Sequence, residues 1–433
     1  MTPLQERPYW WDTVPACQTD AHSELPGSVD VAVIGGGYTG LSAARTLARR
    51  GATVAVLEAQ TCGWGASSRN GGMVLTGLKQ EPEALIARYG AEAVRRWYAA
   101  SLASIDYVER IVGEEGIACD FARTGHLEVA VKRRHFEGFQ RSAELVAREF
   151  RHTLRIVPGR DLHEEIGSEI YFGGRVDDSS AGVNPARYVA GLRKAAERAG
   201  ALLFDRTRVE RVERQRGNAA APWLLRTARG NLAARAVLAA TGGYTGNATP
   251  ALHRRVIPIG SYMIATEPLP AGLARAASPR NRMIYDSKHF LYYYRLTPDR
   301  RMLFGGRAAF FPETDRTVRS SAEILRRGMR HVYPMLRDVS VAYVWGGTLD
   351  FTFDTMPHAG QLDGIYFALG YAGHGVAMAT YLGARMAEAI EGDPHANPFE
   401  GLPFPKAPLG LYKGKPWFLP LAAAWYKLLD WIA

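Results

Sequence analysis

The sequence predicts an α/β protein of two domains. From residue 29 to residue 58, a strand, a glycine-rich turn, a helix and a second strand follow one another. Two later strands, at 236–240 and 365–369, also end in glycine-rich turns, whereas 262–268 and 289–307 have the pattern of an antiparallel sheet. These observations favour a Rossmann-type nucleotide-binding domain built from separate segments, joined to a second domain with an antiparallel sheet.

The composition is that of a globular protein. Of the 433 residues, 47% are hydrophobic and 22% are charged, which argues against broadly disordered or collagen-like chains. Lys and Arg number 53 and Asp and Glu 43, so the formal net charge is +10. Because the arginines are spread along the chain and form no basic stripe, we do not expect a nucleic-acid partner.

The cysteines and the N-terminus indicate a protein of a reducing compartment. Cys17, Cys62 and Cys119 form no C-x-x-C pair, so we expect neither a disulfide framework nor a metal site. The first thirty residues contain no continuous apolar segment of the kind found in signal peptides. We therefore expect a cytoplasmic location.

A nucleotide-binding motif begins with the β-branched run 29–34, which predicts a buried strand. The next six residues have the pattern G-x-G-x-x-G. The first glycine of this pattern allows the tight turn, the second lets backbone N–H groups approach a pyrophosphate, and the third lets the helix pack close to the strand. In this chain they are Gly35, Gly37 and Gly40, with Tyr38 and Thr39 between the last two.

An acidic residue ends the second strand of this unit. Gly51 ends the helix, and the run 52–58 predicts a strand that finishes at Glu58. A carboxylate at this position can accept hydrogen bonds from both ribose hydroxyls of an adenosine. Strand, glycines, helix, strand and acid at this spacing predict a dinucleotide site; the alternative is a glycine-rich turn that binds nothing.

The segment after Glu58 favours FAD over NAD. A nicotinamide-dependent enzyme would usually continue through further β-α units, whereas residues 62–72 read CGWGASSRNGG. A loop so rich in Gly and Ser can run close along an extended ligand. The loop contains Ala66, Ser67, Ser68 and Arg69, which we take as candidate cofactor-binding residues.

Three later segments predict further parts of the same sheet. Asn184-Pro185 has the residue types preferred at a helix start, and that helix leads to a strand at 201–204. The strand 236–240 ends in Thr241-Gly242, where the backbone can approach the cofactor. The strand 365–369 ends in a turn over 370–375, and N–H groups at the following helix start can stabilise negative charge on a reduced flavin.

The second domain is predicted from a hairpin. Residues 289–307 turn at Thr297-Pro298-Asp299. In a strand, Tyr292 and Tyr294 must point to one face and Tyr293 to the other. Arg295 could anchor a carboxylate, although an Arg beside a turn is more often solvated. Residues 91–113 predict a packing helix of this domain.

Seven blocks of the chain resemble the glycine and D-amino-acid oxidase (DAO) family of FAD-dependent oxidoreductases, and most closely its gamma-glutamylputrescine oxidase-like branch. The resemblance spans nearly the whole chain, and the blocks stand in the expected order. They are 35–40, GWGASSRNGG at 63–72, DDSSAGVNPARYVAGLRKAAERAGA at 177–201, VLAATGGYTG at 237–246, YYYRLTPDRRMLFGGR at 292–307, WGGTLDFTFDTMPHAG at 345–360 and GYAGHGVAMATYLGARMAEAI at 370–390.

The resemblance implies oxidation of a C–N bond of an amine or amino acid. A hydride passes from the carbon beside the nitrogen to flavin N5, the imine hydrolyses, and electrons pass to O2 or a quinone. The catalytic candidates are Tyr293, expected over the flavin, with Trp345, His374 and Arg69. For His374, an imidazole that only satisfies backbone groups in a tight turn is equally plausible. The cofactor-binding candidates are Gly35, Gly37, Tyr38, Thr39, Gly40, Glu58, Ala66, Ser67, Ser68, Arg69, Val209, Thr241, Gly242, Gly373, His374 and Gly375.

The chain departs from its relatives in three ways. The segment 345–348 lacks the cysteine that tethers the flavin in several relatives, so noncovalent FAD is expected. Gly72 and Ala377 stand where sarcosine-oxidising relatives carry a carboxylate clamp, which favours an amine or a differently anchored amino acid. The segment 301–307 lacks the lysine that helps to activate oxygen, so a dehydrogenase or a flavin-binding protein without turnover stays an alternative to an oxidase.

The C-terminal tail has a composition of its own. After a proline-rich stretch, Leu421, Trp425, Leu428 and Ile432 recur at helical spacing. The segment 417–433 is too short and too charged to span a bilayer, so it either packs on protein or contacts a membrane surface peripherally. The expected division is 1–82, 151–250 and 344–392 for the FAD-binding domain, 83–150 and 251–343 for the substrate domain, and 393–433 for the tail.

Overall fold

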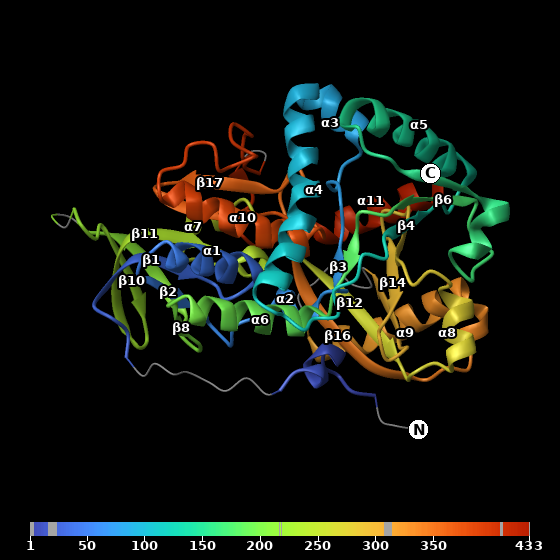
Figure 1. Cartoon of the computed structure of the whole chain (residues 1–433), viewed down its shortest axis with the longest axis horizontal. Coiled ribbons are helices and arrows are strands. Elements are labelled where there is room, and N and C mark those ends of the chain that lie inside the picture. The colour runs from blue at the N-terminus through green and yellow to red at the C-terminus, as the bar shows by residue number, and fades with distance from the viewer. Residues whose placement is uncertain are drawn as a thin grey trace.

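The computed structural model describes residues 4–15, 24–215, 217, 219–306, 314–407 and 410–432. Figure 1 shows two halves that lie side by side, each built around one eight-stranded sheet. Cys17 and Arg307 lie outside the described residues.

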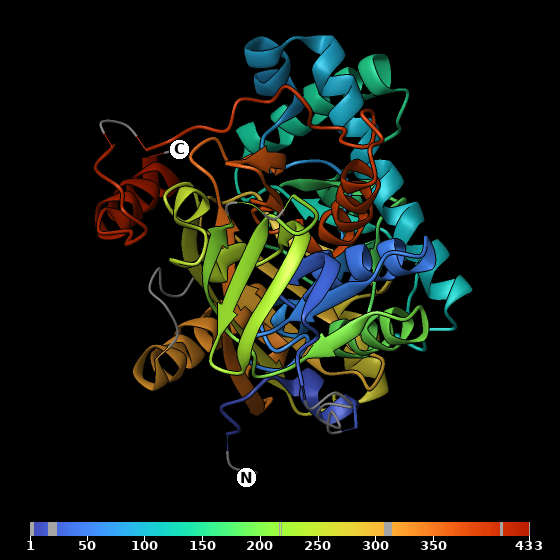
Figure 2. The ribbon, with the colours of Figure 1, turned by 90° about the vertical axis from the view of Figure 1, so that its left-hand side faces the viewer.

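The nucleotide-binding half contains the predicted parallel sheet, which faces the viewer in Figure 2. Five parallel strands lie in the order β18-β11-β1-β2-β8, with β17 antiparallel to β18 and the β9–β10 hairpin antiparallel to β11. The strands are β1 (Ser28–Ile34), β2 (Val54–Leu57), β8 (Leu202–Phe204), β9 (Val209–Arg214), β10 (Trp223–Thr227), β11 (Gly230–Ala239), β17 (His358–Leu362) and β18 (Ile365–Leu369).

Both faces of this sheet are covered, which explains the continuous apolar sequence of β1. Val31 and Val33 pack in the cluster that contains α1 and α10, whereas Ala32 and Ile34 pack in a second cluster with β9 and β10. The helices of this half are α1 (Tyr38–Arg49), α2 (Ala66–Arg69), α6 (Pro185–Arg198), α7 (Pro250–His253) and α10 (Gly375–Ile390). As predicted, the Asn184 side chain caps α6 by accepting a hydrogen bond from the Arg187 N–H.

The second half contains the predicted hairpin within a sheet of order β16-β12-β15-β14-β13-β4-β6-β5. All neighbouring pairs are antiparallel except β4 and β13, which are parallel. The strands are β4 (His126–Val129), β5 (Arg155–Pro158), β6 (Gly173–Asp177), β12 (Ile257–Thr266), β13 (Met283–Asp286), β14 (Tyr292–Leu296), β15 (Met302–Gly306) and β16 (Val341–Phe351). Its helices are α5 (Arg133–Phe150), α8 (Ala271–Ala277) and α9 (Asp315–Val332).

The tyrosines of β14 alternate as predicted. Tyr294 is fully buried in the core between the sheet and α9, with Tyr292 packed beside it. Tyr293 lies on the opposite face, toward the nucleotide-binding half, and packs against the cluster that contains Trp345. The hairpin therefore directs one tyrosine toward the junction of the halves.

The expected domain boundaries shift at three places. Strands β5 and β6 fall in the segment 151–250 but pair within the second sheet, because β6 is bonded to β4. Strand β16 belongs to the second sheet as far as Phe351, because it pairs with β12 along its length. The expected division assigned this strand to the FAD-binding domain from residue 344 onward. The helix α4 (Ala91–Glu114), preceded by α3 (Pro82–Tyr89), packs on α10 and shares the core of the nucleotide-binding half.

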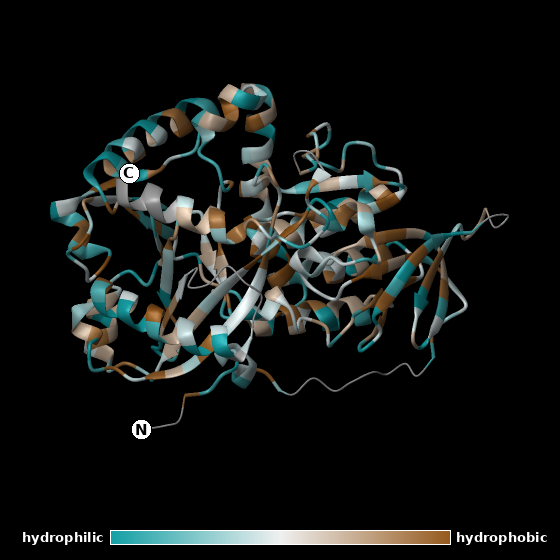
Figure 3. Ribbon diagram, turned by 180° about the vertical axis from the view of Figure 1, so that it is seen from behind, coloured by the Kyte–Doolittle hydropathy of each residue, from teal (hydrophilic) through white to brown (hydrophobic). Residues whose placement is uncertain are grey.

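The tail forms the short predicted helix, α11 (Leu419–Ile432). In Figure 3, hydrophobic residues gather on the strands inside the molecule. The start of α11 packs on the second sheet, where Leu419 contacts the cluster of Ile257, Ile259 and Phe351. Trp417, Leu421 and Trp425 are 61%, 69% and 59% exposed. No helix in the described part of the chain is long and apolar enough to cross a membrane. The side chains of residues 426–433 lie outside the described set.

Candidate active site

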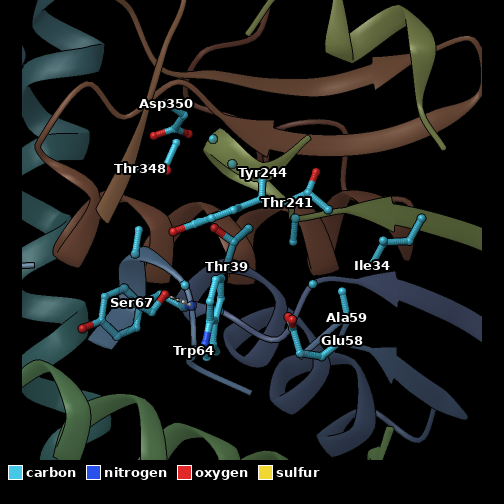
Figure 4. A pocket seen from close by; sticks show the side chains of 18 of the residues that line it. Ile34, Thr39, Glu58, Ala59, Trp64, Ser67, Thr241, Tyr244, Thr348 and Asp350 are labelled. Carbon is cyan, nitrogen blue, oxygen red and sulfur yellow. Dashed lines mark hydrogen bonds between the residues drawn. The ribbon is translucent and has the colours of Figure 1, made fainter. Parts of the chain in front are cut away.

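A cavity of about 570 Å³ opens at the carboxyl ends of β1, β2 and β11. This is the edge at which open α/β sheets bind ligands, because the helix N-termini and turns meet there. Of the predicted residues, the cavity is lined by Gly35, Gly37, Tyr38, Thr39, Glu58, Ala66, Ser67, Val209, Thr241, Gly242, Gly373 and Gly375. Figure 4 shows the side chains of Glu58, Thr39, Ser67 and Thr241 around this space.

The glycine motif forms the turn that the spacing predicts. Gly35 has φ +106°, and a Cβ there would stand 2.6 Å from the carbonyl oxygen of Ala240. Gly40 does not line the cavity, because it packs directly on the Gly35 carbonyl and so brings α1 close to β1. Gly37 is the N-cap of α1 and has no side chain, so the helix start faces the cavity, and a helix start of this kind can bind an anion.

Glu58 is positioned by backbone donors. Its Oε2 accepts from the Gly36 N–H at 2.8 Å and its Oε1 from the Gln60 N–H at 2.9 Å. Burial raises the pKa of this carboxyl, and the two N–H donors oppose the rise. The carboxylate therefore lies fixed beside the glycine turn, where an adenosine ribose would lie.

Some side chains of the loop 62–72 line the cavity, and others make hydrogen bonds to the rest of the protein. Ser67 Oγ accepts from the Tyr38 N–H at 3.1 Å in the cavity wall, as the dashed line in Figure 4 marks. Ser68 instead turns away and accepts from the Trp11 indole at 2.9 Å, so the expectation of a cofactor contact at Ser68 needs correction. Arg69 is held by the carbonyl oxygens of Trp64 and Gly346, at 2.9 and 3.1 Å.

The opposite wall contains residues that the sequence analysis missed. Figure 4 shows Thr348 and Asp350 above the space and Tyr244 reaching into it. Thr348 and Asp350 are two residues apart on β16, so their side chains point to the same face of the strand. Two polar residues at this spacing in an otherwise apolar strand could have indicated a cavity wall from the sequence. Asp350 is buried and its Oδ2 accepts from the Gly370 N–H at 2.6 Å. Burial raises its pKa to about 6.

A smaller cavity of about 150 Å³ adjoins the first and shares Ala66, Thr348 and Gly373 with it. Tyr293, His374 and Arg69 line it, so three of the four predicted catalytic residues come together there. The Tyr293 hydroxyl lies 3.0 Å from Ser261 Oγ. Most of the remaining wall is apolar, with Met73, Leu75, Leu291, Leu349 and Val376.

His374 lies at the start of α10 with its Nδ1 buried. This atom has no hydrogen-bond partner among the described residues. Burial lowers the pKa of His374 to about 3, with Lys79 and His126 acting in the same direction. The imidazole is therefore neutral at neutral pH and can accept a hydrogen bond from a ligand.

Two expectations are corrected by tertiary packing. Trp345 is 1% exposed and lies in the core behind the cavity, where its indole Nε1 donates to the Arg69 carbonyl at 2.8 Å. Arg295 is buried instead of solvated, and it donates to the carbonyls of Gly72 and Val183 at 2.8 and 3.1 Å. Burial lowers the pKa of Arg295 to about 10. Both residues support the site from outside the cavity.

Comparisons with known proteins agree with this geometry. The family model of the FAD-dependent oxidoreductases, DAO, matches residues 30–389. Gamma-glutamylputrescine oxidoreductase of Escherichia coli K12 is 31% identical over 93% of this chain and 92% of its own. The probable oxidoreductase OrdL of Haemophilus influenzae is 32% identical over 93% of this chain and 92% of its own.

The chain belongs to the DAO family of FAD-dependent oxidoreductases. Among solved structures, glycine oxidase from Geobacillus kaustophilus superposes with a TM-score of 0.73 at 21% identity, covering 88% of this chain and 99% of its own. L-proline dehydrogenase from P. horikoshii gives 0.70 at 21% identity, covering 87% and 96%. These two similarities support the fold: a Rossmann-type domain with a second, mainly antiparallel sheet.

The residues of this DAO-family chain fit FAD. The long cavity runs from Glu58 and the start of α1 to Gly373 at the start of α10, which suits an extended dinucleotide. Glu58 would hold the ribose, the N–H groups after Gly37 the diphosphate, and the α10 start the pyrimidine edge of the flavin. No group of three or more His, Cys, Asp or Glu among the described residues is placed to hold a metal ion.

Proposed function

We propose that this FAD-dependent oxidoreductase oxidises a C–N bond of a small amine or amino acid and passes the electrons to O2, forming H2O2. The observation that carries the proposal is the apolar cavity beside the FAD cavity, with Tyr293 and His374 in its wall. When bound, FAD would accept a hydride from the carbon next to the nitrogen. Water then converts the released imine to a carbonyl compound and ammonia or an amine.

The chain's own residues orient the amine and exclude water. Neutral His374 accepts a hydrogen bond from the substrate nitrogen but is too weak a base to hold its proton. Tyr293, supported by Ser261, covers the carbon side of the substrate. Arg69 holds the cofactor loop through the carbonyls of Trp64 and Gly346. The apolar wall keeps the reacting centre dry.

An anaerobic absorbance titration tests this proposal. The purified yellow protein is titrated with putrescine derivatives, N-methyl amino acids, cyclic imino acids and D-amino acids, and air is then admitted. Bleaching by one class identifies the substrate, and rapid recovery of colour in air supports the oxidase. A yellow protein that no compound bleaches would overturn the proposal in favour of a flavin-binding protein without turnover. Release of all flavin by acid precipitation would support noncovalent FAD.

A second candidate is a membrane-associated dehydrogenase that reduces a quinone. The observation that favours it is the exposure of Trp417, Leu421 and Trp425 at the C-terminus, since aromatic and apolar side chains partition into membrane interfaces. Slow recovery of the flavin colour in air and rapid recovery with a soluble quinone would support it. Removing residues 417–433 should then move the protein from the membrane fraction to the soluble fraction. Unchanged partitioning would refute the membrane contact.

A further inference from the structure

The amine oxidation proposed above releases a proton inside the active site. In neutral solution an alkylamine is mostly an ammonium ion, which must lose a proton before its carbon can give up a hydride. In the cavity of about 150 Å³, here called the flavin-side cavity, His374 does not keep this proton, because burial lowers its pKa to about 3. Arg69 and Lys79 in the same wall are cations and have no lone pair to accept it. The proton therefore needs a route out of the cavity.

A row of polar side chains crosses the second sheet, starting from Tyr293. Tyr293 on β14 pairs with Tyr285 on β13, and Tyr285 pairs with Glu128 on β4. Glu128 pairs in turn with Arg175 on β6. Directly paired residues of neighbouring strands point to the same face of a sheet, so these side chains lie on the face that Tyr293 presents to the nucleotide-binding half.

His126 lies next to this row and touches it. It stands two residues before Glu128 on β4, so it points to the same face, and it pairs with Asp177 on β6. Its ring stacks on that of Tyr285 with 5.4 Å between the centroids, and its Nε2 lies 3.3 Å from the Tyr285 hydroxyl. Its Nδ1 lies 2.7 Å from Ser180 Oγ. An imidazole with hydroxyl partners at both nitrogens can take up a proton at one and release a proton from the other.

A polar cavity of about 60 Å³ continues from the flavin-side cavity over these side chains. Tyr285 and His374 line both cavities, so the two spaces meet there. His126 and Asp177 also line the polar cavity. Since a water molecule needs about 10–15 Å³ and two or more polar partners, this space is large and polar enough for several. Water in it would connect His126 with Asp177.

The far end of the polar cavity reaches the surface. Asp177 Oδ2 accepts from Thr76 Oγ1 at 2.5 Å and from His152 Nε2 at 2.9 Å. Burial opposes ionisation of Asp177, but the hydrogen bond from His152 and the other polar neighbours lower its pKa to about 2. The carboxylate therefore holds the ring of His152, whose side chain is 13% exposed. Imidazoles exchange protons with water near neutral pH, so this pair is a suitable exit.

The fixed charges around the polar cavity are paired with one another. Arg175 bonds to Glu81 at 2.7 Å and to Glu128 at 2.6 Å. Lys79 adds a second positive charge that acts on the same two acids. Asp177 has His152 as its partner. No acid in the wall is thus left without a nearby cation or imidazole to offset its charge, so a passing proton meets no deep trap.

His126 itself does not trap the proton. Burial lowers its pKa to about 4; Asp177 opposes this effect, and Arg175, Arg282 and His152 reinforce it. His126 is therefore neutral at rest and returns a proton quickly. The other titratable groups that line the polar cavity are Tyr98, Tyr285, Glu81 and His374.

We propose that the proton of the bound ammonium leaves the flavin-side cavity through Tyr285 and His126 and reaches solvent at His152. The N–H bond of the ammonium breaks, its electron pair stays on the nitrogen, and one proton appears in solvent. Each hydroxyl or imidazole on the route accepts one proton and passes one on, so no charge accumulates. The inference rests on the proposed amine oxidation and adds the residues that carry its proton.

Anaerobic stopped-flow mixing of the holoenzyme with substrate tests the inference. The probes are putrescine, N-methylglycine, L-proline and D-alanine, and the compound that bleaches the flavin fastest is used at saturation. Flavin absorbance reports reduction, while phenol red in a weakly buffered solution reports proton release. In the wild type, one proton for each flavin should appear no later than the bleaching.

Two variants interrupt the route. Near neutral pH, Tyr285→Phe and His126→Ala should slow both signals by about tenfold or more, because the ammonium loses its proton more slowly. The deficit should shrink as the pH approaches about 10, where much of an alkylamine arrives already neutral. His135→Ala is the matched control, because His135 Nδ1 also lies 2.7 Å from a serine Oγ, that of Ser287, but lines neither cavity. It should behave as the wild type does.

Each outcome decides one of the two proposals. Tyr285→Phe removes a single oxygen atom, so it tests the route even if His126→Ala fails to fold. If Tyr285→Phe reduces the flavin and releases the proton as fast as the wild type near neutral pH, the route is refuted while amine oxidation stands. A deficit of equal size at every pH would show that these side chains only shape the cavity, and would also refute it. If no probe bleaches the wild-type flavin, amine oxidation itself fails and the inference falls with it.

Discussion

The indole of Trp345 and the backbone of Arg69 join the two halves of the molecule. Trp345 Nε1, on β16, donates to the Arg69 carbonyl oxygen, 2.8 Å away and 276 residues distant in sequence. Arg69 in turn donates through Nη1 to the carbonyl of Gly346, the next residue after Trp345. The second sheet and the cofactor loop therefore hold each other through reciprocal hydrogen bonds, and we expect the loop to depend on β16.

Replacing Trp345 should loosen this loop. Trp345→Phe keeps an aromatic ring but leaves the buried Arg69 carbonyl without its donor, which costs about 2 kcal/mol of unfolding free energy. Denaturant unfolding of the holoprotein measures the loss, and flavin fluorescence measures the release of FAD. Trp223→Phe, at a buried position on β10, is the matched control. Equal FAD release from both variants would contradict a role for Trp345 in holding the loop.

Removing the charge of Glu58 should weaken FAD binding. Glu58→Gln replaces a carboxylate that accepts from the Gly36 and Gln60 N–H groups, and it takes a strong acceptor away from the ribose. Because hydrogen bonds to charged groups contribute about 1.5–3 kcal/mol, the Kd for FAD should rise about 10- to 100-fold. Titration of the apoprotein with FAD measures this Kd. Glu213→Gln, on the β9–β10 hairpin outside the cavity, should leave the Kd unchanged.

Asp350 should make the apoprotein less stable as the pH rises. Burial raises the pKa of Asp350 from 3.8 to about 6. Between about pH 4 and pH 6, the carboxyl is therefore protonated in the folded state and ionised in the unfolded state. Its contribution is fully present below about pH 4 and is lost as the pH rises through about 6. At about 1.4 kcal/mol for each pH unit in this interval, the loss approaches about 3 kcal/mol.

The variant Asp350→Asn isolates this effect. The difference in unfolding free energy between Asp350→Asn and the wild type should shift in favour of the variant between about pH 4 and pH 7, since the amide does not titrate. Urea unfolding at closely spaced pH values measures the difference. A difference that does not change with pH would show that Asp350 is ionised throughout in the folded protein.

His374 should orient the substrate without shaping the pH profile. Because its pKa lies near 3, the imidazole is neutral across the working range. His374→Gln should therefore slow flavin reduction by about tenfold through the loss of one hydrogen bond, and keep the same limbs in the pH profile of kcat/KM. A limb between about pH 6 and pH 7 that disappears in the variant would instead identify His374 as a titrating base.

Local sequence was sufficient for the cofactor half of the site. The β-α-β unit places Gly35, Gly37 and Glu58 at one cavity because the strand and helix geometry between them is regular and short-range. The alternation of β14 similarly separated Tyr293 from Tyr294 without knowledge of the fold. Each of these predictions depends on backbone periodicity, which neighbouring residues determine.

The tertiary structure alone decided what surrounds each long side chain. Arg295 was expected in solvent, yet it lies buried against the carbonyls of Gly72 and Val183, which no local pattern connects with it. Trp345 was expected in the cavity wall but lies in the core, again because of contacts with segments distant in sequence. A cavity of about 60 Å³ is the clearest case, since Thr76, Asp177 and His374 line it from three distant segments.

The sequence by itself therefore determined the cofactor, the fold and the family. It did so because the backbone conformations that bind a dinucleotide require particular residues at fixed spacing. Which polar groups are buried together was decided only by the packing of the two halves. Side-chain burial, hydrogen bonding and pKa depend on contacts between segments far apart in the chain, and periodicity carries no information about those contacts.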